Sequence, residues 1–473
     1  MQRSIRRALI LLTATAVVCS GLGSAAAATS SPTLNGEYDA VRSVPLTKDN
    51  AHASLDQMFA AHPAPRSAAA LAGGAERPEF SEKSRAQQQE IARPGKYIQG
   101  ARQVSSANRS ALASGVDDKV TPEECRQKFL DDDLKGAVWF KNHFSACHAR
   151  ILLFDHYQCK GKDCVLTGRA MADAVFFTTM NKNERAADLA VKLWDFKEQN
   201  YPNERRINFA VGCWGAQSGV RCDPTTSEVT GTFGEWKNYG TVYRPVKYIG
   251  TGTETPNDPA LNEKRTYFEL NPYFYVESGN KDGSPAFVTF PPVYLRCDIA
   301  RTAVNPQYAR GSDCIFHELA GSFQVSASDP AIAESAQFIR RAQEHIEQTK
   351  PGTPGTYVPG RYGSGQALTR MYYDQAAIDT NRSTSIAKCV EFFGPDYTKR
   401  NDPKNPSDTN DCDEYPFAKT HQGTYSVKGN TPRSYAVQPL LSQHNQKLGS
   451  MLGIWMGEDH ILEEDPFYVI ITD

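Results

Sequence analysis

Beyond its N-terminal segment, the sequence lacks an apolar run long enough to cross a membrane. A membrane-spanning helix needs roughly 18 or more consecutive apolar residues, and no later segment of the 473-residue chain approaches that length. The chain also lacks an excess of charge of one sign, because its formal net charge is −2 at pH 7. This balance alone favours neither nucleic acid nor a membrane surface as the partner. We therefore expect no membrane anchor.

The cysteines lack the spacing of a zinc site. One of the 11, Cys19, lies in the N-terminal apolar segment. Cys159 and Cys164 have no second cysteine pair at zinc-finger spacing beside them. An even number of remaining cysteines in an exported chain favours disulfides. Their order favours sequential pairs, although the sequence alone leaves the connectivity open: Cys125 with Cys147, Cys159 with Cys164, Cys213 with Cys222, Cys297 with Cys314, and Cys389 with Cys412.

The N-terminus has the features of a secretory signal peptide. Three arginines precede an apolar run from Ala8 to Val18, and small residues from Ser24 to Ala28 offer a cleavage site. Cys19 follows Val18 and not the small residue that a lipoprotein signal requires, which argues against a lipid anchor. We interpret residues 1–28 as a signal peptide and expect a soluble, secreted, extracellular protein.

Residues 29–113 are rich in Ala, Ser, Pro and charge and show little periodicity. A short helix near Leu55 to Ala60 is the only regular element that we expect there. Segments of this composition bury too little apolar surface to offset the entropy of folding. We interpret residues 29–113 as a low-complexity leader or propeptide. A linker to a surface is the alternative.

Residues 114–325 are dominated by strand patterns. Ala170 to Thr179 and Ala186 to Phe196 alternate around a polar turn, which predicts a hairpin. Further strands are expected over Ile207 to Trp214, Val229 to Trp236, Thr266 to Glu277, Ala286 to Tyr294 and Gly321 to Ser326. Short strands, frequent turns and local cystines predict an antiparallel β-sandwich-like domain stapled by disulfides. No catalytic set is evident in this region, and its partner is unknown.

Residues 326–473 combine helical and strand patterns. The expected helices are Ala333 to Ile346, Tyr373 to Lys388 and Asn445 to Trp455, and the expected strands are Ser434 to Leu440 and Phe467 to Thr472. This mixture predicts a small α+β domain. The whole chain is therefore expected to be multidomain, with an N-terminal antiparallel β-sandwich-like domain followed by the α+β domain.

Two adjacent carboxylates stand out in this second domain. Asp413 and Glu414 follow the half-cystine Cys412 and precede Tyr415-Pro416-Phe417. Hard cations prefer oxygen ligands, so the pair indicates a divalent-metal or acid/base site. A pair of acids on a solvated loop is the alternative. We predict that a Cys389–Cys412 disulfide ties the second helix to this loop.

Several spaced elements resemble the NucA/NucB family of secreted bacterial deoxyribonucleases. They are the run from Cys412 to Thr420 with Gly423 behind it, Asn445 followed by Gly449 and Leu452, and Ile461-Leu462 with Asp465 to Val469. The resemblance covers roughly residues 325–473, where the Ala333 to Ile346 helix resembles the family's first helix. It implies metal-assisted hydrolysis of DNA phosphodiester bonds with little sequence preference and with Mg²⁺ or Mn²⁺ as cofactor.

The resemblance also implies roles for individual residues. Asp413 and Glu414 match the family's acidic pair and would bind metal or activate water, without deciding which residue does which. Asn445 matches the asparagine of the downstream motif and would be a metal ligand, or alternatively a helix cap. Such groups suit the reaction, because a divalent cation neutralises the charge that grows on phosphate and a base activates water.

The sequence departs from the family at two positions. Gln422 stands before Gly423 where members carry an acidic residue, and His444 stands before Asn445 where an aspartate is usual. Either His421 takes the proton-transfer role, or catalysis is weakened. Two solvated loop histidines are the remaining alternative.

Acidic side chains outnumber basic ones over residues 366–473, which is the opposite of a basic nucleic-acid footprint. However, acids cluster between Glu458 and Asp465, whereas Lys419, Arg433 and Lys447 surround the motif and are candidate phosphate-binding residues. The sequence thus predicts a secreted, metal-dependent endonuclease that acts on DNA. The alternatives are a catalytically weakened nuclease-like binding or toxin-associated secreted protein, and a cystine-stapled protein without catalysis.

Overall fold

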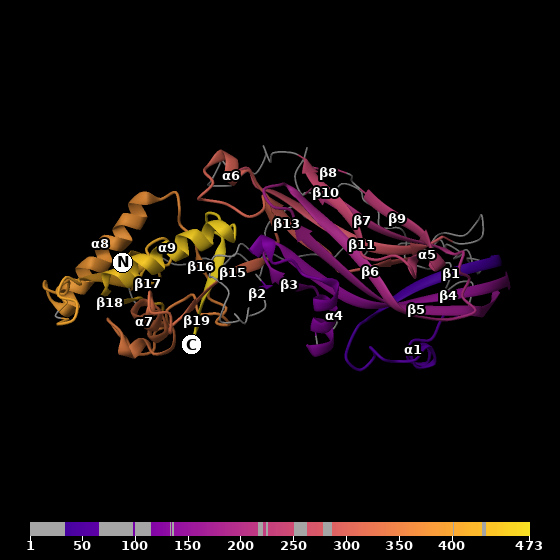
Figure 1. Cartoon of the computed structure of the whole chain (residues 1–473), viewed down its shortest axis with the longest axis horizontal. Coiled ribbons are helices and arrows are strands. Elements are labelled where there is room, and N and C mark those ends of the chain that lie inside the picture. The colour runs from indigo at the N-terminus through magenta and orange to yellow at the C-terminus, as the bar shows by residue number, and fades with distance from the viewer. Residues whose placement is uncertain are drawn as a thin grey trace, which may run out of the picture.

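A computed structural model shows a β-rich domain beside a C-terminal domain, on the right and left of Figure 1 respectively. The structure describes residues 34–65, 98–99, 115–132, 134, 137–215, 221–223, 226–249, 263–277, 286–400, 402–427 and 432–473. The expected signal peptide lies outside these residues. Among them, no helix is long and apolar enough to cross a membrane.

A seven-stranded antiparallel sheet forms one layer of the β-rich domain. Its order is β1 (Leu34–Pro45), β4 (Ser145–Gly161), β5 (Asp163–Met180), β6 (Ala186–Gln199), β10 (Val242–Ile249) and β8 (Arg221–Asp223), with β3 (Trp139–Asn142) paired to β4. The β5–β6 pairing confirms the predicted hairpin. Helices α1 (Leu55–Ala61) and α4 (Pro122–Asp131) cover the outer face of this sheet through a second apolar cluster. A short 3₁₀ turn, η1 (Gly115–Asp117), precedes α4.

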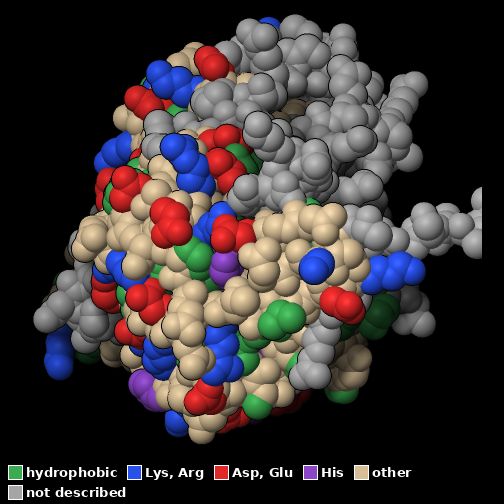
Figure 2. Space-filling model, turned by 90° about the vertical axis from the view of Figure 1, so that its right-hand side faces the viewer, with side chains coloured by type: hydrophobic (Ala, Val, Ile, Leu, Met, Phe, Trp, Pro, Cys, Tyr) green, Lys and Arg blue, Asp and Glu red, His purple; other side chains and the backbone are tan. Residues whose placement is uncertain are grey.

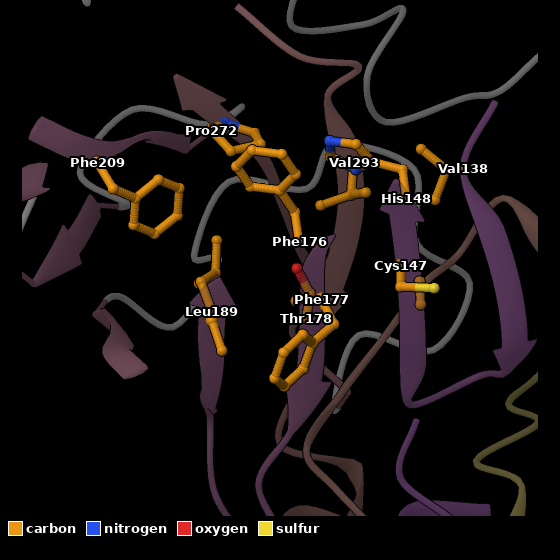
Figure 3. A pocket seen from close by; sticks show the side chains of 12 residues that line it. Val138, Cys147, His148, Phe176, Phe177, Thr178, Leu189, Phe209, Pro272 and Val293 are labelled. Carbon is orange, nitrogen blue, oxygen red and sulfur yellow. The ribbon is translucent and has the colours of Figure 1, made fainter. Parts of the chain in front are cut away.

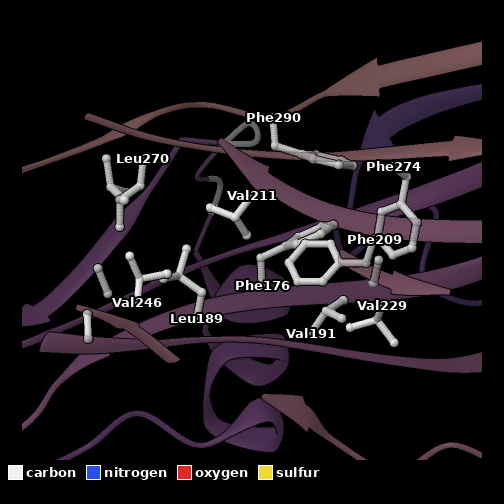
Figure 4. Close-up of a cluster of buried hydrophobic side chains, with 14 of the residues drawn as sticks. Phe176, Leu189, Val191, Phe209, Val211, Val229, Val246, Leu270, Phe274 and Phe290 are labelled. Atoms are coloured by element: carbon white, nitrogen blue, oxygen red, sulfur yellow. The ribbon is translucent and has the colours of Figure 1, made fainter. Parts of the chain in front are cut away.

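A six-stranded antiparallel sheet forms the other layer. Its order is β14 (Cys314–Ile315), β13 (Val293–Cys297), β11 (Thr266–Val276), β7 (Arg206–Gly215) and β9 (Thr226–Thr232), with β12 (Ala286–Thr289) paired to β11. The two sheets share one core, in which Phe176 and Leu189 of the first sheet meet Phe209, Leu270 and Phe274 of the second (Figure 4). The central strands β4 and β5 are buried along most of their length, because the first sheet packs against the second sheet on one face and against α1 and α4 on the other.

The expectation of an unpacked leader over residues 29–113 is wrong for residues 34–65. β1 pairs with β4 along its whole length, and Val41 and Val44 are buried. The pattern was hard to recognise because polar and small residues occupy most other positions of this edge strand. Residues 66–97 and 100–114 lie outside the described residues.

Two predicted strands differ from the observed elements. The strand expected over Val229 to Trp236 ends at Thr232, where the Thr232 side chain caps the short helix α5 (Phe233–Trp236). The strand expected over Ala286 to Tyr294 is divided into β12 and β13, because two prolines, Pro291 and Pro292, cannot donate ladder hydrogen bonds. A further short helix, α6 (Ala300–Ala303), follows β13.

All five disulfides predicted from the cysteine order are present. They are Cys125–Cys147, Cys159–Cys164, Cys213–Cys222, Cys297–Cys314 and Cys389–Cys412. The first four lie within the β-rich domain. The fifth joins a helix to a strand in the C-terminal domain, as expected.

The C-terminal domain is built on a four-stranded mixed sheet and a separate two-stranded ribbon. The sheet order is β16 (Leu368–Thr369), β19 (Pro466–Thr472), β15 (Leu319–Ser326) and β2 (Ile98–Gln99), and the ribbon consists of β17 (Asn410–Tyr415) and β18 (Ala436–Leu441). The helices are α7 (Ala333–Glu344), α8 (Gln375–Phe393) and α9 (Ser442–Glu458), with 3₁₀ turns η2 (Ile346–Gln348) and η3 (Thr424–Ser426). The α+β expectation therefore describes the residues that follow β15.

The domain boundary predicted at residue 325 is misplaced. β15 pairs in parallel with β19, so it belongs to the C-terminal sheet. Its first residue, Leu319, packs in the core of the β-rich domain, whereas Phe323 and Val325 pack in the core of the C-terminal domain. Alternation in a sequence identifies a strand but not its partner, which is why the boundary was missed.

Two buried histidines form contacts across the junction between the two domains. His143 Nδ1 lies 2.9 Å from the Asp459 carbonyl and 3.1 Å from its carboxylate, and Nε2 lies 2.8 Å from the Leu319 carbonyl. Because both nitrogens face acceptors only, both carry protons. Burial alone would lower the pKa of His143, but Asp459 and the two carbonyls outweigh it and raise the pKa to about 9. His460 is similarly placed between the Asp298 carboxylate and the Arg310 carbonyl.

We expect the charge on His143 to make the stability of the fold depend on pH. The folded pKa of about 9 exceeds the unfolded value of 6.5, so this stabilisation is complete below pH 6.5 and is lost as the pH rises to about 9. Its loss should lower the free energy of unfolding by about 3 kcal/mol. Denaturant unfolding at pH 6 and pH 9.5 should show a smaller change in His143→Gln than in the wild type. An unchanged difference in His143→Gln would contradict this, and exposed His345→Gln is the control.

Candidate active site

β17 carries the two predicted carboxylates to opposite faces of the ribbon. Asp413 lies opposite Gln438 and Glu414 opposite Val437 in an uninterrupted antiparallel register. Side chains of consecutive strand residues point to opposite faces. The neighbour Tyr415 accepts a hydrogen bond from Gln343 of α7. Asp413 therefore faces α7, whereas Glu414 shares the face on which α8 packs. The side chains of Asp413 and Glu414 therefore do not converge on a common position.

Asp413 is buried with one oxygen unsatisfied. Its Oδ1 accepts a hydrogen bond from the Glu414 N–H at 2.9 Å, whereas Oδ2 has no hydrogen-bond partner among the described residues. The buried Ser335 hydroxyl of α7 lies near this carboxylate but outside hydrogen-bonding geometry. Burial raises the pKa of Asp413 to about 6, against the opposing effects of Ser335 and the Glu414 amide. An unpaired buried oxygen is costly, so it indicates a missing partner.

The first turn of α9 lies on the same side of the ribbon as Asp413. Gln446 Nε2 donates to Asp411 Oδ2 at 3.1 Å, and Asp411 and Asp413 share one face of β17. Asn445 precedes Gln446 and is half-buried. His444 accepts a hydrogen bond from the Glu334 N–H at 3.4 Å, which ties α9 to α7. Asn445 therefore lies on a turn of α9 that adjoins the Asp413 side of the ribbon, although no hydrogen bond joins it to Asp413 among the described residues.

The oxygen atoms available on this side of the ribbon are ligands that suit a hard divalent cation. The Asp413 carboxylate, the Ser335 hydroxyl and the Asn445 amide offer oxygen atoms, which Mg²⁺ and Mn²⁺ prefer. In the part of the chain that the structure describes, no three His, Cys, Asp or Glu side chains converge as a metal site. A cation held here would thus depend on one carboxylate, neutral oxygens and groups of the substrate.

Glu414 faces positively charged side chains. It is half-buried, and its Oε1 accepts a hydrogen bond from the Ala418 N–H at 3.3 Å. Burial raises the pKa of Glu414 to about 8; the Asp413 charge adds to this and Arg382 opposes it. Lys419 is exposed, and its pKa is lowered by partial burial of its amine and by the nearby Arg382 and Arg370. A carboxyl group beside several cations is the arrangement expected of a phosphate-binding surface.

Arg382 was not among the predicted site residues. It lies on α8 with its side chain 48% exposed and contacts Asp379 at 3.3 Å. A signal was present, because Arg382 follows Asn381 on the helix that the Cys389–Cys412 disulfide ties to the acidic strand. Sequence spacing alone could not show that this helix faces Glu414 and not Asp413.

The loop after Glu414 is fixed by Asn381 of α8. Asn381 Nδ2 donates to the Ala418 carbonyl at 2.9 Å, and its Oδ1 accepts from the Tyr425 N–H at 3.0 Å. A Cβ on Gly423 would lie 2.3 Å from Asn381 Nδ2, so only glycine fits there. The motif glycine thus makes room for a buried amide that shapes the loop.

Gln422 has a structural partner. Its Oε1 accepts from the Thr369 N–H at 2.9 Å and its Nε2 donates to the Thr369 hydroxyl at 3.1 Å. The side chain therefore connects the loop to β16. A glutamate could accept from the same Thr369 N–H and hydroxyl, so these contacts engage Gln422 without explaining why it replaces an acidic residue.

His421 has an acidic partner that sequence analysis missed. Its side chain is 37% exposed, and Nε2 lies 3.0 Å from Glu463 Oε1. Arg433 donates to the Ser426 carbonyl at 2.9 Å and to its hydroxyl at 3.0 Å, so it closes a loop. Lys447 is exposed on α9. Of the three predicted phosphate-binding residues, Lys419 is the one near Arg382, which also acts on Glu414.

The β-rich domain shows no comparable site among its described residues. A small cavity between its sheets is lined mainly by apolar side chains and by His148 (Figure 3). His148 stacks on Phe176, and burial lowers its pKa to about 3, so it stays neutral and has no acid–base role. On the face shown in Figure 2, acidic and basic side chains intermix among the described residues. Arg169 and Asp56 form one ion pair of this domain.

We expect the ionised Asp413 to weaken the metal-free fold. Its folded pKa of about 6 exceeds the usual 3.8, so stability falls as the pH rises from about 4 to about 6. At pH 7.5 in chelator, Asp413→Asn should raise the free energy of unfolding by roughly 1–3 kcal/mol. Denaturant unfolding measures this, and half-exposed Asp411→Asn is the control. A destabilised Asp413→Asn at pH 7.5 would show that the carboxylate is structural.

The comparisons with known proteins concern this region alone. Neither the curated proteins nor the solved structures contain a match to the chain. The helix α7, which was expected to correspond to the first helix of the NucA/NucB family, lies outside the matched region. Residues 362–470, which include β17, β18, α8 and α9, match the model of the family described as deoxyribonuclease NucA/NucB, as the acidic motif predicts.

Proposed function

We propose that the C-terminal domain is a metal-dependent deoxyribonuclease that cuts DNA internally with little sequence preference. The observation that carries this proposal is the match of residues 362–470 to a deoxyribonuclease family. The carboxyl groups of buried Asp413 and half-buried Glu414 support it, because strongly raised pKa values are typical of functional sites. We also propose that the protein is secreted, which its five disulfides favour.

We propose that Asp413 and Asn445 hold Mg²⁺ or Mn²⁺, with Ser335 close by. The unpaired Asp413 Oδ2 supports this role, because a cation would give the buried oxygen a partner. When bound, the cation would offset the buried Asp413 charge, and it would neutralise charge on a phosphate only where the substrate reaches the Asp413 face of the ribbon. This assignment divides the predicted acidic pair, since Glu414 lies on the other face of β17.

We propose that Lys419 and Arg382 bind the DNA phosphates beside Glu414. His421 would accept a proton from the attacking water, whose oxygen bonds to phosphorus as the phosphorus–oxygen bond to the leaving group breaks. Glu414 has a pKa of about 8 and is largely protonated at neutral pH. It can therefore donate its proton to the leaving oxygen, in the way that environment-tuned carboxylic acids do.

A catalytically weakened, DNA-binding protein is the second candidate. The observation behind it is Gln422, which replaces the acidic residue expected from the family motif. However, Gln422 is occupied by two hydrogen bonds to Thr369 and points to β16. The proposed activity therefore relies on His421, and not on residue 422, for proton transfer.

Purified protein should nick and then linearise supercoiled plasmid with Mg²⁺ or Mn²⁺, and chelator should stop it. Asp413→Asn should abolish cleavage and also the shift in melting temperature that Mn²⁺ produces in the wild type. Glu414→Gln should lower kcat by about 10²-fold or more, because a general acid is lost. Asp411→Asn, on the same strand, should retain both activity and the Mn²⁺ shift.

Plasmid binding without cleavage under any metal would favour the second candidate. Full activity in both Asp413→Asn and Glu414→Gln would show that the reaction uses other residues. Gel assays of plasmid conversion and thermal melting with and without Mn²⁺ distinguish these results.

Removing a phosphate-binding cation should weaken DNA binding in a salt-dependent manner. For Lys419→Ala or Arg382→Ala, the slope of log affinity against log salt should fall in magnitude by about 1 relative to the wild type. Lys399→Ala is the matched control, because the Lys399 side chain is 70% exposed and its ion-pair partner among the described residues is the exposed Asp396. Fluorescence anisotropy in chelator measures the slopes. Equal slopes in the wild type and the three variants would show that DNA does not bind at Lys419 and Arg382.

A further inference from the structure

Glu463 fixes the orientation of the His421 ring. The Glu463 carboxylate is buried and lies 3.0 Å from His421 Nε2. A carboxylate can only accept, so Nε2 carries the proton in this contact. Nδ1 is then the ring nitrogen left for another partner, and no described residue hydrogen-bonds it. The half-exposed ring therefore offers Nδ1 as the nitrogen that can accept a proton.

The Glu463 side chain is itself held by the backbone before α8. Its Oε2 accepts from the Tyr372 N–H at 2.5 Å and from the Tyr373 N–H at 3.1 Å. Both carboxylate oxygens are thus occupied, one by His421 and the other by backbone donors. Two fixed donors on Oε2 leave the carboxylate little freedom to rotate away from His421.

The backbone of Glu463 is held by the β-rich domain. Its N–H donates to the Tyr308 hydroxyl at 2.7 Å, and its carbonyl accepts from Arg265 Nη2 at 2.8 Å. Tyr308 in turn donates to the Glu263 carboxylate, which also accepts from Arg265 Nε at 2.6 Å and from the Tyr373 hydroxyl at 3.2 Å. Glu263 is fully buried and joins all of these groups.

Three residues that hold Glu463 lie outside the matched family region, whereas Tyr372 and Tyr373 lie within it. Glu263, Arg265 and Tyr308 precede residue 362, where the match begins. The β-rich domain thus supplies contacts that the family region lacks by itself. These contacts reach His421 through a single intervening residue, Glu463.

We propose that Glu463 is a positioning residue for His421, and that Glu263, Arg265 and Tyr308 of the β-rich domain hold Glu463 in place. The β-rich domain then completes the nuclease site of its own chain. This inference rests on the proposed function only for the role of His421 as proton acceptor. The contact itself, and the tautomer that it imposes, do not depend on that role.

The substitution Glu463→Gln should reverse the tautomer of His421. The new amide oxygen should keep the two backbone donors of Tyr372 and Tyr373, so that the amide NH₂ faces His421 Nε2. A donor there favours the tautomer with its proton on Nδ1, which cannot accept a proton from water. We expect kcat to fall by about 10²-fold with KM nearly unchanged, since a small misplacement of a reacting group has an effect of that size.

The test uses the full-length protein labelled with ¹⁵N at histidine, and His421→Asn identifies the His421 signals. The wild type should show an Nε2–H tautomer and Glu463→Gln an Nδ1–H tautomer. Glu463→Asp retains a carboxylate and should keep the wild-type tautomer with a smaller loss of kcat. Tyr308→Phe should lower kcat by about tenfold through Glu463, whereas Tyr275→Phe, elsewhere in the β-rich domain, should not change it.

The outcomes separate the inference from the proposed function. An Nδ1–H tautomer in the wild type, or equal kcat in Glu463→Gln and the wild type, would overturn the positioning role. If Glu463→Gln does not fold, kcat of Glu463→Asp and of Tyr308→Phe tests the positioning role instead. A wild-type kcat in both variants would then overturn that role. If the wild type cuts no DNA, the proposed function fails, and the tautomers of the wild type and Glu463→Gln still decide whether Glu463 positions His421.

Discussion

The loop between α9 and β19 places charged side chains against opposite charges of the β-rich domain. The contacts are Glu458 with Arg310, Asp459 with His143, His460 with Asp298, and Asp465 with Arg296. Removing one partner of a buried pair leaves an uncompensated charge that costs about 3–5 kcal/mol. The relation between the two domains is therefore fixed, and the position of Glu463 within this loop is fixed with it. Three acidic side chains of the C-terminal domain are thus paired with basic side chains of the β-rich domain.

The pKa values of buried carboxyl groups shift in opposite directions at the proposed site and at this junction. At the junction each buried charge meets a partner, and the neighbouring Arg296 holds the pKa of Asp465 far below its usual range despite burial. On β17 desolvation of the Asp413 and Glu414 carboxyl groups dominates, and their pKa values rise although Arg382 opposes the rise at Glu414. A fold that tolerates this loss of stability at two adjacent residues has a reason to keep them, and the proposed cation and phosphate would provide one.

Local features of the fold could be predicted from the sequence, and pairings between distant segments could not. Helix α9 and strand β19 were located because their apolar periodicity is contained in a few neighbouring residues. The pairing of β15 with β19 could not be predicted, because the residues of a strand do not identify the strand with which it pairs. The motif identified Asp413 and Glu414, yet their division between two faces follows from the strand conformation. Arg382 and Glu463 reach the site from other segments, so no spacing in the motif could reveal them.

The parallel pairing of β15 with β19 also determines the order in which the molecule can be completed. β15 follows the β-rich domain directly and begins in its core, so its backbone is available early in synthesis. Its partner strand comes only after all three helices of the C-terminal domain. Until β19 has been synthesised and has paired with β15, the edge of β15 lacks its neighbouring strand. The loop that carries Glu463 is then not anchored at its C-terminal end. Assembly of the proposed site therefore waits for the final strand, which delays any nuclease activity until synthesis of the domain is finished.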